Sequence, residues 1–181
     1  MKKLSKIMLV AFIAILSASC NDDDTSETSV DNSITGIASR NANLSILVQA
    51  LGKAGLASTL QGSGPYTVFA PTNDAFNAFL DANGFDSLDD VPEATLKQIL
   101  LNHVVNGKVL STQLTTGYVK TLATYGTTTS NISMFINTST VEGTKLFNGV
   151  ANFAIANVEA SNGVVHVVDA VIGIPTVVDH A

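Results

Sequence analysis

The amino-acid sequence predicts a single α+β domain, with helices mainly in its first half and strands mainly in its second. Apolar residues recur at helical spacing between Leu44 and Val104, whereas Thr-, Val- and Ile-rich segments separated by glycines follow Gly107. Of the 181 residues, 46% are hydrophobic, which is enough for one packed core, and no internal repeat divides the chain. We therefore expect one domain of ordinary size.

The first predicted helix covers residues 44–51, because its apolar residues share one helical face: Leu44, Leu47, Val48 and Leu51. Asn43 can serve as its N-cap, since an asparagine side chain accepts a hydrogen bond from the free amides of a first turn. A short buried strand, Tyr66–Ala70, follows a turn rich in glycine. Pro71 is expected to end this strand.

Two further helices are predicted after the strand. Thr72 or Asn73 can cap a helix that ends at Asn83-Gly84 and carries these apolar residues on one face: Ala75, Phe76, Phe79 and Leu80. Pro92 suits the first turn of the next helix. Its inward-facing residues are expected to be Leu96, Ile99, Leu100 and Val104.

Two Asn-Gly pairs mark turns in the strand-rich half. Asn148-Gly149 and Asn162-Gly163 favour tight turns because both residue types tolerate a positive φ angle. Residues 154–159 are expected to pair with residues 164–168 across Asn162-Gly163. The second half of the chain is therefore predicted to contain β-hairpins.

The amino terminus has the layout of an export signal. A lysine-rich start precedes a short apolar run, Ile7–Leu16, which is well below the ~20 residues of a membrane-spanning helix. Cys20 follows small residues, and this arrangement resembles a bacterial lipoprotein signal, in which the cysteine becomes the first mature residue and carries the lipid. Residues 1–19 are thus predicted to be removed. The alternative is an ordinary cleaved signal with an incidental cysteine.

Residues 20–32 are predicted to form a flexible acidic tether between the lipid and the domain. The acidic run also resembles the surface-export signal of Bacteroidetes lipoproteins, although a plain spacer is an alternative. We expect an outer-membrane lipoprotein that is exposed on the cell surface; the alternatives are a periplasm-facing or a secreted protein.

Three segments carry a family resemblance. GPYTVFAPTNDAFNAF (residues 64–79) and NGVVHVVDAVIGIP (residues 162–175) resemble the two signatures of the fasciclin domain, and ILLNHVVNGKV (residues 99–109) is similar to the short Tyr-His region of that family. The resemblance extends over residues 33–178 and leaves 179–181 as a tail. It implies a β-sandwich or wedge of about seven strands, with several helices of the N-terminal half packed on it.

The resemblance also implies a function. Fasciclin domains are extracellular or surface-attached and act mostly in adhesion, so the chain is expected to be a non-catalytic binding module for an extracellular protein or polysaccharide. Its contact with the membrane would be the N-terminal lipid. A rival interpretation is a periplasm-facing structural or regulatory protein that binds a neighbouring envelope component.

Composition excludes other classes of function. The formal net charge is −6, so the chain offers no basic surface for a nucleic acid. A single cysteine cannot form an internal disulfide or a metal site built from several thiolates. The three histidines, at positions 103, 166 and 180, show no ligand spacing. We expect no nucleic-acid partner, no metal and no cofactor.

Five polar residues lie within the otherwise apolar signatures: Thr72, Asn73, Asp74, His166 and Asp169. Buried polar groups need partners, so we hypothesise that Thr72 or Asn73 forms a hydrogen bond towards His166 or Asp169 and locks the two signatures together. The alternative is a catalytic set in which Thr72 or a serine is the nucleophile, His166 the base and Asp169 the orienting group. No nucleophile-elbow pattern surrounds any serine, which disfavours an enzyme.

Candidate ligand-binding residues lie in two places. Asn102-His103 occupies the position of the family's Tyr-His pair, which has been linked to receptor binding; the tyrosine is absent here, and a satisfied core histidine is the alternative. In the middle segment, Gly117–Val150, Tyr118 and Tyr125 stand among Thr and Asn residues and could stack on sugar rings. The alternative for this segment is an ordinary set of solvent-facing hairpin residues.

Overall fold

The computed structural model describes residues 30–124, 129–138 and 146–174. The predicted signal peptide, Cys20, all but the last three residues of the predicted tether and the predicted tail lie outside these ranges. Within the described ranges, no helix combines the length and apolar character needed to cross a membrane.

The α-helices occupy the N-terminal half, as the sequence predicts. They are α1 (Ile34–Arg40), α2 (Ser45–Lys53), α3 (Ala57–Gln61), α4 (Asn73–Asn83) and α5 (Glu93–Asn102). Three short 3-10 helices are η1 (Ala42–Leu44), η2 (Leu88–Asp90) and η3 (Ser111–Gln113). The strands are β1 (Tyr66–Pro71), β2 (Val104–Asn106), β3 (Gly117–Thr124), β4 (Asn131–Asn137), β5 (Leu146–Phe147), β6 (Phe153–Ala160) and β7 (Gly163–Val168). The α+β prediction and its approximate strand number are confirmed.

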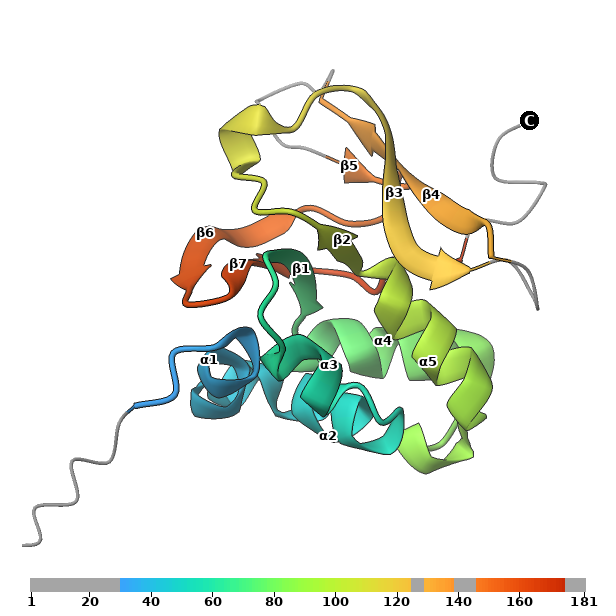
Figure 1. The fold of residues 1–181 in the computed structure, drawn as a ribbon. Coiled ribbons are helices and arrows are strands. Elements are labelled where there is room, and N and C mark those ends of the chain that lie inside the picture. The colour runs from blue at the N-terminus through green and yellow to red at the C-terminus, as the bar shows by residue number, and fades with distance from the viewer. Residues whose placement is uncertain (1–29, 125–128, 139–145, 175–181) are drawn as a thin grey trace, which may run out of the picture.

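The seven strands follow the hydrogen-bonded order β5-β4-β3-β2-β1-β7-β6. β1 and β7, one strand from each signature, pair in parallel from Tyr66↔Gly163 to Pro71↔Val168, and every other pairing is antiparallel. Only Val105↔Thr121 joins β2 to β3, so the sheet bends there. Figure 1 shows the result as layers: the α-helices, then β1, β2, β6 and β7, then β3, β4 and β5.

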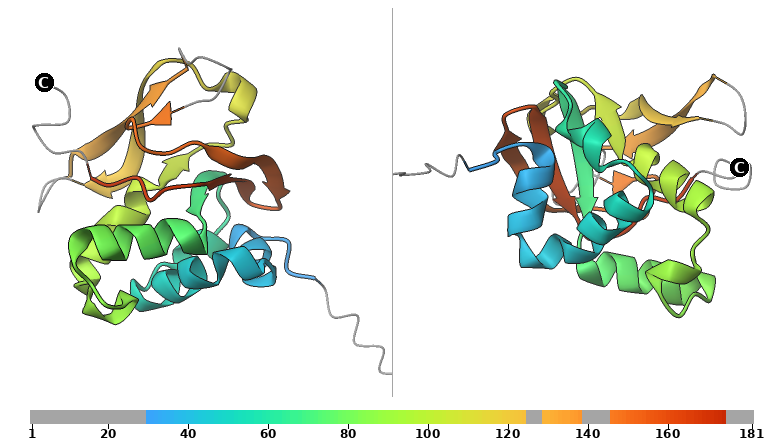
Figure 2. Two further views of the ribbon diagram at one scale, coloured as in Figure 1. Left: turned by 180° about the vertical axis from the view of Figure 1, so that it is seen from behind. Right: turned by 60° about the horizontal axis from the view of Figure 1, so that its bottom comes forward.

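Two apolar cores fill the spaces between these layers. The larger core joins the helices to one face of β1 and β7 and includes Phe76 and Val165. The smaller core lies inside the bend of the sheet and contains Phe69, Phe147 and Ile172. All of β7 is buried because each of its faces meets one core. The reverse view in Figure 2 again shows the five α-helices of the described residues on a single side of the sheet.

The helix caps confirm one prediction and correct another. Thr72 caps α4, since its hydroxyl accepts a hydrogen bond from the Ala75 amide at 3.2 Å. The prediction of Asn43 as a cap is wrong, because α2 has no side-chain cap of its own. Instead, the Asn73 side chain accepts a hydrogen bond from the Ile46 amide at 3.0 Å, so α4 supplies the cap of α2.

One of the two predicted turns is displaced. Asn148 and Gly149 have φ angles of 48° and 71°, as a tight Asn-Gly turn requires. In the other hairpin Ala160 pairs with Gly163, so the turn consists of Ser161 and Asn162 rather than Asn162-Gly163. Gly163 is already part of β7, where a Cβ atom would overlap the Tyr66 carbonyl group. Close approach of two backbones therefore explains this glycine.

Candidate functional site

The Thr72 and Asn73 side chains form their hydrogen bonds with helical segments rather than with the second signature. Besides capping α2, Asn73 donates a hydrogen bond from Nδ2 to the Ala42 carbonyl oxygen at 2.9 Å. Asp74 is exposed in the first turn of α4, where a negative charge suits the helix dipole. The hypothesis that Thr72 or Asn73 bonds to His166 or Asp169 is wrong. Backbone pairing of β1 with β7, extended by a Thr72 amide bond to the Val168 carbonyl at 3.1 Å, joins the signatures instead.

His166 is completely buried and holds a loop in place. Its Nε2 lies 2.9 Å from the Val109 carbonyl oxygen, and its Nδ1 accepts a hydrogen bond from the Asn157 amide at 3.1 Å. These partners indicate a neutral ring with the proton on Nε2. Asp169 is exposed and accepts a hydrogen bond from the Asn152 amide at 2.6 Å. Neither residue is arranged to activate Thr72, which caps its own helix.

Asn102 and His103 lie in the core. His103 Nδ1 is 2.8 Å from the Ile99 carbonyl oxygen, and its Nε2 accepts a hydrogen bond from the Ile172 amide at 2.8 Å. Burial lowers the pKa of His103 to about 4. Asn102 donates to the Ile172 and Gly173 carbonyl oxygens and accepts a hydrogen bond from Thr121. The structure thus places this pair in the satisfied core position that the sequence left as the alternative, away from any surface that a partner could reach.

The outer face of β3 and β4 carries an aromatic pair in which Tyr118 is exposed and Phe135 is half-buried. Tyr118 is 63% exposed and lies opposite Phe135, with 5.0 Å between the ring centroids. The side chains of Thr116, which is exposed, and Thr138, which is half-buried, are joined by a hydrogen bond at 2.7 Å. Thr121 is one of the threonines of Gly117–Val150, but it is 1% exposed and buried rather than facing the solvent. Tyr125 lies outside the described residues.

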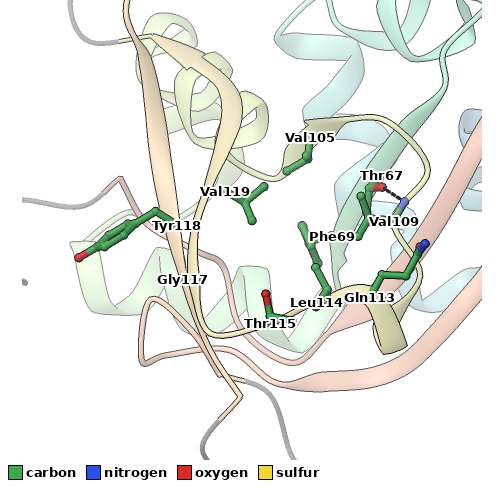
Figure 3. A pocket seen from close by; sticks show the side chains of 10 residues that line it. All are labelled: Thr67, Phe69, Val105, Val109, Gln113, Leu114, Thr115, Gly117, Tyr118 and Val119. Atoms are coloured by element: carbon green, nitrogen blue, oxygen red, sulfur yellow. Dashed lines mark hydrogen bonds between the residues drawn. The ribbon is translucent and has the colours of Figure 1, made fainter.

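A small apolar pocket lies between the β2–β3 loop and the sheet (Figure 3). Its volume is about 130 Å³, and its apolar lining includes Phe69, Val105, Leu114 and Val119. Gln113 and Thr115 are the exposed polar residues of its lining. In Figure 3 the Tyr118 ring points away from the other labelled side chains. Tyr118 is nevertheless one of the residues that line the pocket, so the pocket and the aromatic pair adjoin at this residue.

The structural roles of two residues, Thr67 and Asn162, were not predicted from the sequence. The Thr67 hydroxyl accepts a hydrogen bond from the Val109 amide and donates one to the Gly107 carbonyl oxygen at 2.6 Å. Asn162 is buried and binds backbone groups of Ile34, Leu60 and Gly62. The only local signal was a polar side chain beside long apolar runs. Among the described residues, no cluster of His, Cys, Asp and Glu could hold a metal ion.

Comparison with known proteins adds a family match. The family model described as "Fasciclin domain" matches residues 42–175. "Protein sll1483" of Synechocystis sp. is 40% identical over 151 residues, which cover 81% of this chain and 77% of that protein. A second Synechocystis protein, "Uncharacterized protein sll1735", is 34% identical over 139 residues, which cover 77% of this chain and 96% of that protein.

More distant relatives include animal proteins. Transforming growth factor-beta-induced protein ig-h3 of Sus scrofa is 28% identical over 142 residues, which cover 78% of this chain and 19% of that protein. The fold resembles a solved FAS1 domain pair from the insect cell adhesion molecule Fasciclin I, with a TM-score of 0.62 and 15% identity; the match covers 83% of this chain and 53% of that one. That structural likeness supports the fold alone.

Proposed function

This chain belongs to the fasciclin domain family, and we propose that it is a non-catalytic adhesion module, held by a lipid on Cys20 and displayed on the cell surface. The observation that carries the proposal is the aromatic pair on β3 and β4, whose Tyr118 ring is exposed, on a fold that resembles that of a named insect cell adhesion molecule. The candidate catalytic residues support a non-enzymatic role, because both His166 ring nitrogens have backbone partners.

The position of the chain's described start supports β3–β4 as the contact surface. Val30 precedes α1, and both figures show α1 at the opposite end of the domain from β4. A lipid reached through the acidic segment before Val30 would hold the helical end towards the membrane. The outer face of β3 and β4 would then lie farthest from the lipid, where partners outside the cell are met.

The chemistry of this face favours a polysaccharide over a protein ligand. Tyr118 and Phe135 offer neighbouring aromatic surfaces, and the apolar C–H faces of sugar rings pack against such rings. The Thr116 and Thr138 hydroxyl groups lie on the same pair of strand ends and can exchange hydrogen bonds with sugar hydroxyls. Many anchored copies could bind one polymer together, so weak individual contacts suffice.

Two experiments test these parts separately. Protease treatment of intact cells, with a cleavage site added in the tether, should remove the domain while periplasmic controls stay intact. Cys20→Ser should release the protein from the membrane fraction. Protection until the cells are lysed would contradict surface display and favour the rival envelope-binding role.

The ligand class is tested by binding of the cells to immobilised polysaccharides. Tyr118→Ala should lower binding several-fold at unchanged surface amount, because it removes the most exposed ring of the pair. Ile155→Ala is the matched control, since Ile155 is also a large exposed apolar residue, at 53%, but lies on β6, at the other end of the strand order from β4 and β5. Equal binding by the two variants would refute this contact surface.

A further inference from the structure

We propose that the pocket beneath the β2–β3 loop binds one small neutral aromatic molecule, of about the size of phenol. Its walls are apolar: Phe69 and Val105 come from β1 and β2, Val119 from β3, and Leu114 from the loop. Preformed apolar concavities with a few polar groups at the edge are the usual form of small-molecule sites in proteins. The pocket adjoins the proposed adhesion surface at Tyr118, whose ring points away from the other lining side chains, and this proposal does not rest on the proposed function.

The pocket is held open by hydrogen bonds to its loop. Thr67 of β1 binds the Val109 amide at 2.9 Å, and His166 of β7 lies 2.9 Å from the Val109 carbonyl oxygen. Asn157 of β6 accepts from the Ser111 amide at 2.8 Å and donates to the Ser111 hydroxyl at 2.9 Å. Three strands thus fix the loop above the sheet. The loop cannot settle onto Phe69 to fill the space without breaking these bonds.

The size and walls of the pocket select the ligand. Its volume of about 130 Å³ is close to the roughly 150 Å³ of an apolar cavity that is known to hold benzene. Phe69 already lies 4.6 Å from Phe147, ring centroid to ring centroid, so a bound ring would extend an existing aromatic cluster. None of the lining residues is charged, and an anion would find no cationic partner there.

Polar side chains at the mouth of the pocket can form hydrogen bonds with one polar group on the ligand. Thr115 is exposed beside the opening, and its hydroxyl can donate or accept a hydrogen bond. Gln113 uses its carbonyl oxygen to accept from the Leu110 amide at 2.8 Å, which leaves its amide group to donate. A phenolic hydroxyl at the mouth could therefore bind to the rim while its ring occupies the apolar interior.

Nuclear magnetic resonance titration of the full protein with phenol tests the proposal. The backbone amide signals of Phe69, Leu114 and Val119 should shift in a saturable manner, with a Kd in the range of roughly 0.1–10 mM, as expected for so small a ligand. Benzoate, which carries a carboxylate on the same ring, should bind at least tenfold more weakly because the site lacks a cation.

Three variants locate the binding. Val119→Phe places a ring inside the pocket and should abolish the saturable shifts. Thr115→Phe covers the opening from an exposed position, and it preserves the test if Val119→Phe does not fold. Val150→Phe makes the same Val-to-Phe change at a 55% exposed position outside the pocket and should bind phenol like the unmodified protein. Shifts that never saturate, shifts that survive in both pocket variants, or equal binding of benzoate would each overturn the proposal.

Discussion

Asn162 is predicted to hold three segments of the domain together, and replacing it should be costly. Its Oδ1 accepts a hydrogen bond from the Ile34 amide at 2.9 Å, and its Nδ2 donates to the Leu60 and Gly62 carbonyl oxygens at 2.7 and 2.9 Å. Each net hydrogen bond contributes about 1 kcal/mol, and a buried backbone group left without a partner adds to the loss. Ile34 and Leu60 are 2% and 3% exposed, so water does not readily replace the side chain at two of the three positions. We expect Asn162→Gly and Asn162→Ala each to lower the free energy of unfolding by about 3–4 kcal/mol.

The Asn162→Gly variant distinguishes this hydrogen-bonding role of Asn162 from a role in the β6–β7 turn alone. If Asn162 only served the β6–β7 turn, glycine would replace it with little loss, because glycine adopts every turn conformation. Urea unfolding followed by far-ultraviolet circular dichroism measures the difference, since the chain has no tryptophan for fluorescence. Ser161→Ala is the control in the same turn, because Ser161 is exposed and should change stability by less than about 0.5 kcal/mol. A loss below about 1 kcal/mol in Asn162→Gly would refute the reasoning.

Three further predictions concern stability. Burial lowers the pKa of His103 from 6.5 to about 4, so on acidification the unfolded chain takes up this proton before the folded protein does. The contribution of His103 to the free energy of unfolding should therefore be complete above pH 6.5 and should fall by about 3 kcal/mol as the pH drops towards 4. Urea unfolding at several pH values should show a weaker pH dependence of the free energy of unfolding in His103→Gln. Gly163→Ala should lower the free energy of unfolding by several kcal/mol, because the added Cβ would overlap a carbonyl group of β1. Gly52→Ala, on α2 where a Cβ meets no other atom, should instead raise it by about 0.5–1 kcal/mol. A similar effect at both sites would contradict the close approach of β1 and β7 at Gly163. Asn73→Ala should lower the free energy of unfolding, measured by thermal unfolding, by about 1–2 kcal/mol because it removes the cap of α2, while Asn43→Ala should leave it nearly unchanged. A larger loss in Asn43→Ala than in Asn73→Ala would support Asn43 as the cap, as the sequence predicted.

The sequence predicted correctly those features that depend on residues close together in the chain. Thr72 caps α4 through an amide three residues away, and Gly84 ends that helix with a φ angle of 70°. The cap of α2 was mispredicted because Asn73, 27 residues along the chain, provides it. Asn162 was assigned to a turn for the same reason, since its partner Leu60 is 102 residues away. Long-range partners leave no periodic pattern in a sequence.

For the candidate site, the neighbours of each residue in space were harder to predict than its exposure. Tyr118 was expected at the surface and is exposed, but its partner Phe135 was not identified, because alternation along β4 cannot show which strand lies beside it. The pocket was not predicted either. It is formed by a loop held to β6 and β7, and residues that are far apart in the sequence meet only when the sheet bends at Val105↔Thr121.

The signature side chains and the proposed contact surface differ in what a partner would have to do to reach them. Asn73, His103 and His166 already use their polar atoms in hydrogen bonds within the domain, so binding through them would require breaking those bonds. Tyr118 presents its ring from the outer face of a strand whose opposite face holds the core. A partner can therefore gain contact area there without disturbing the fold. Changes on this face can alter binding while stability is kept, whereas changes at the signature residues alter stability first.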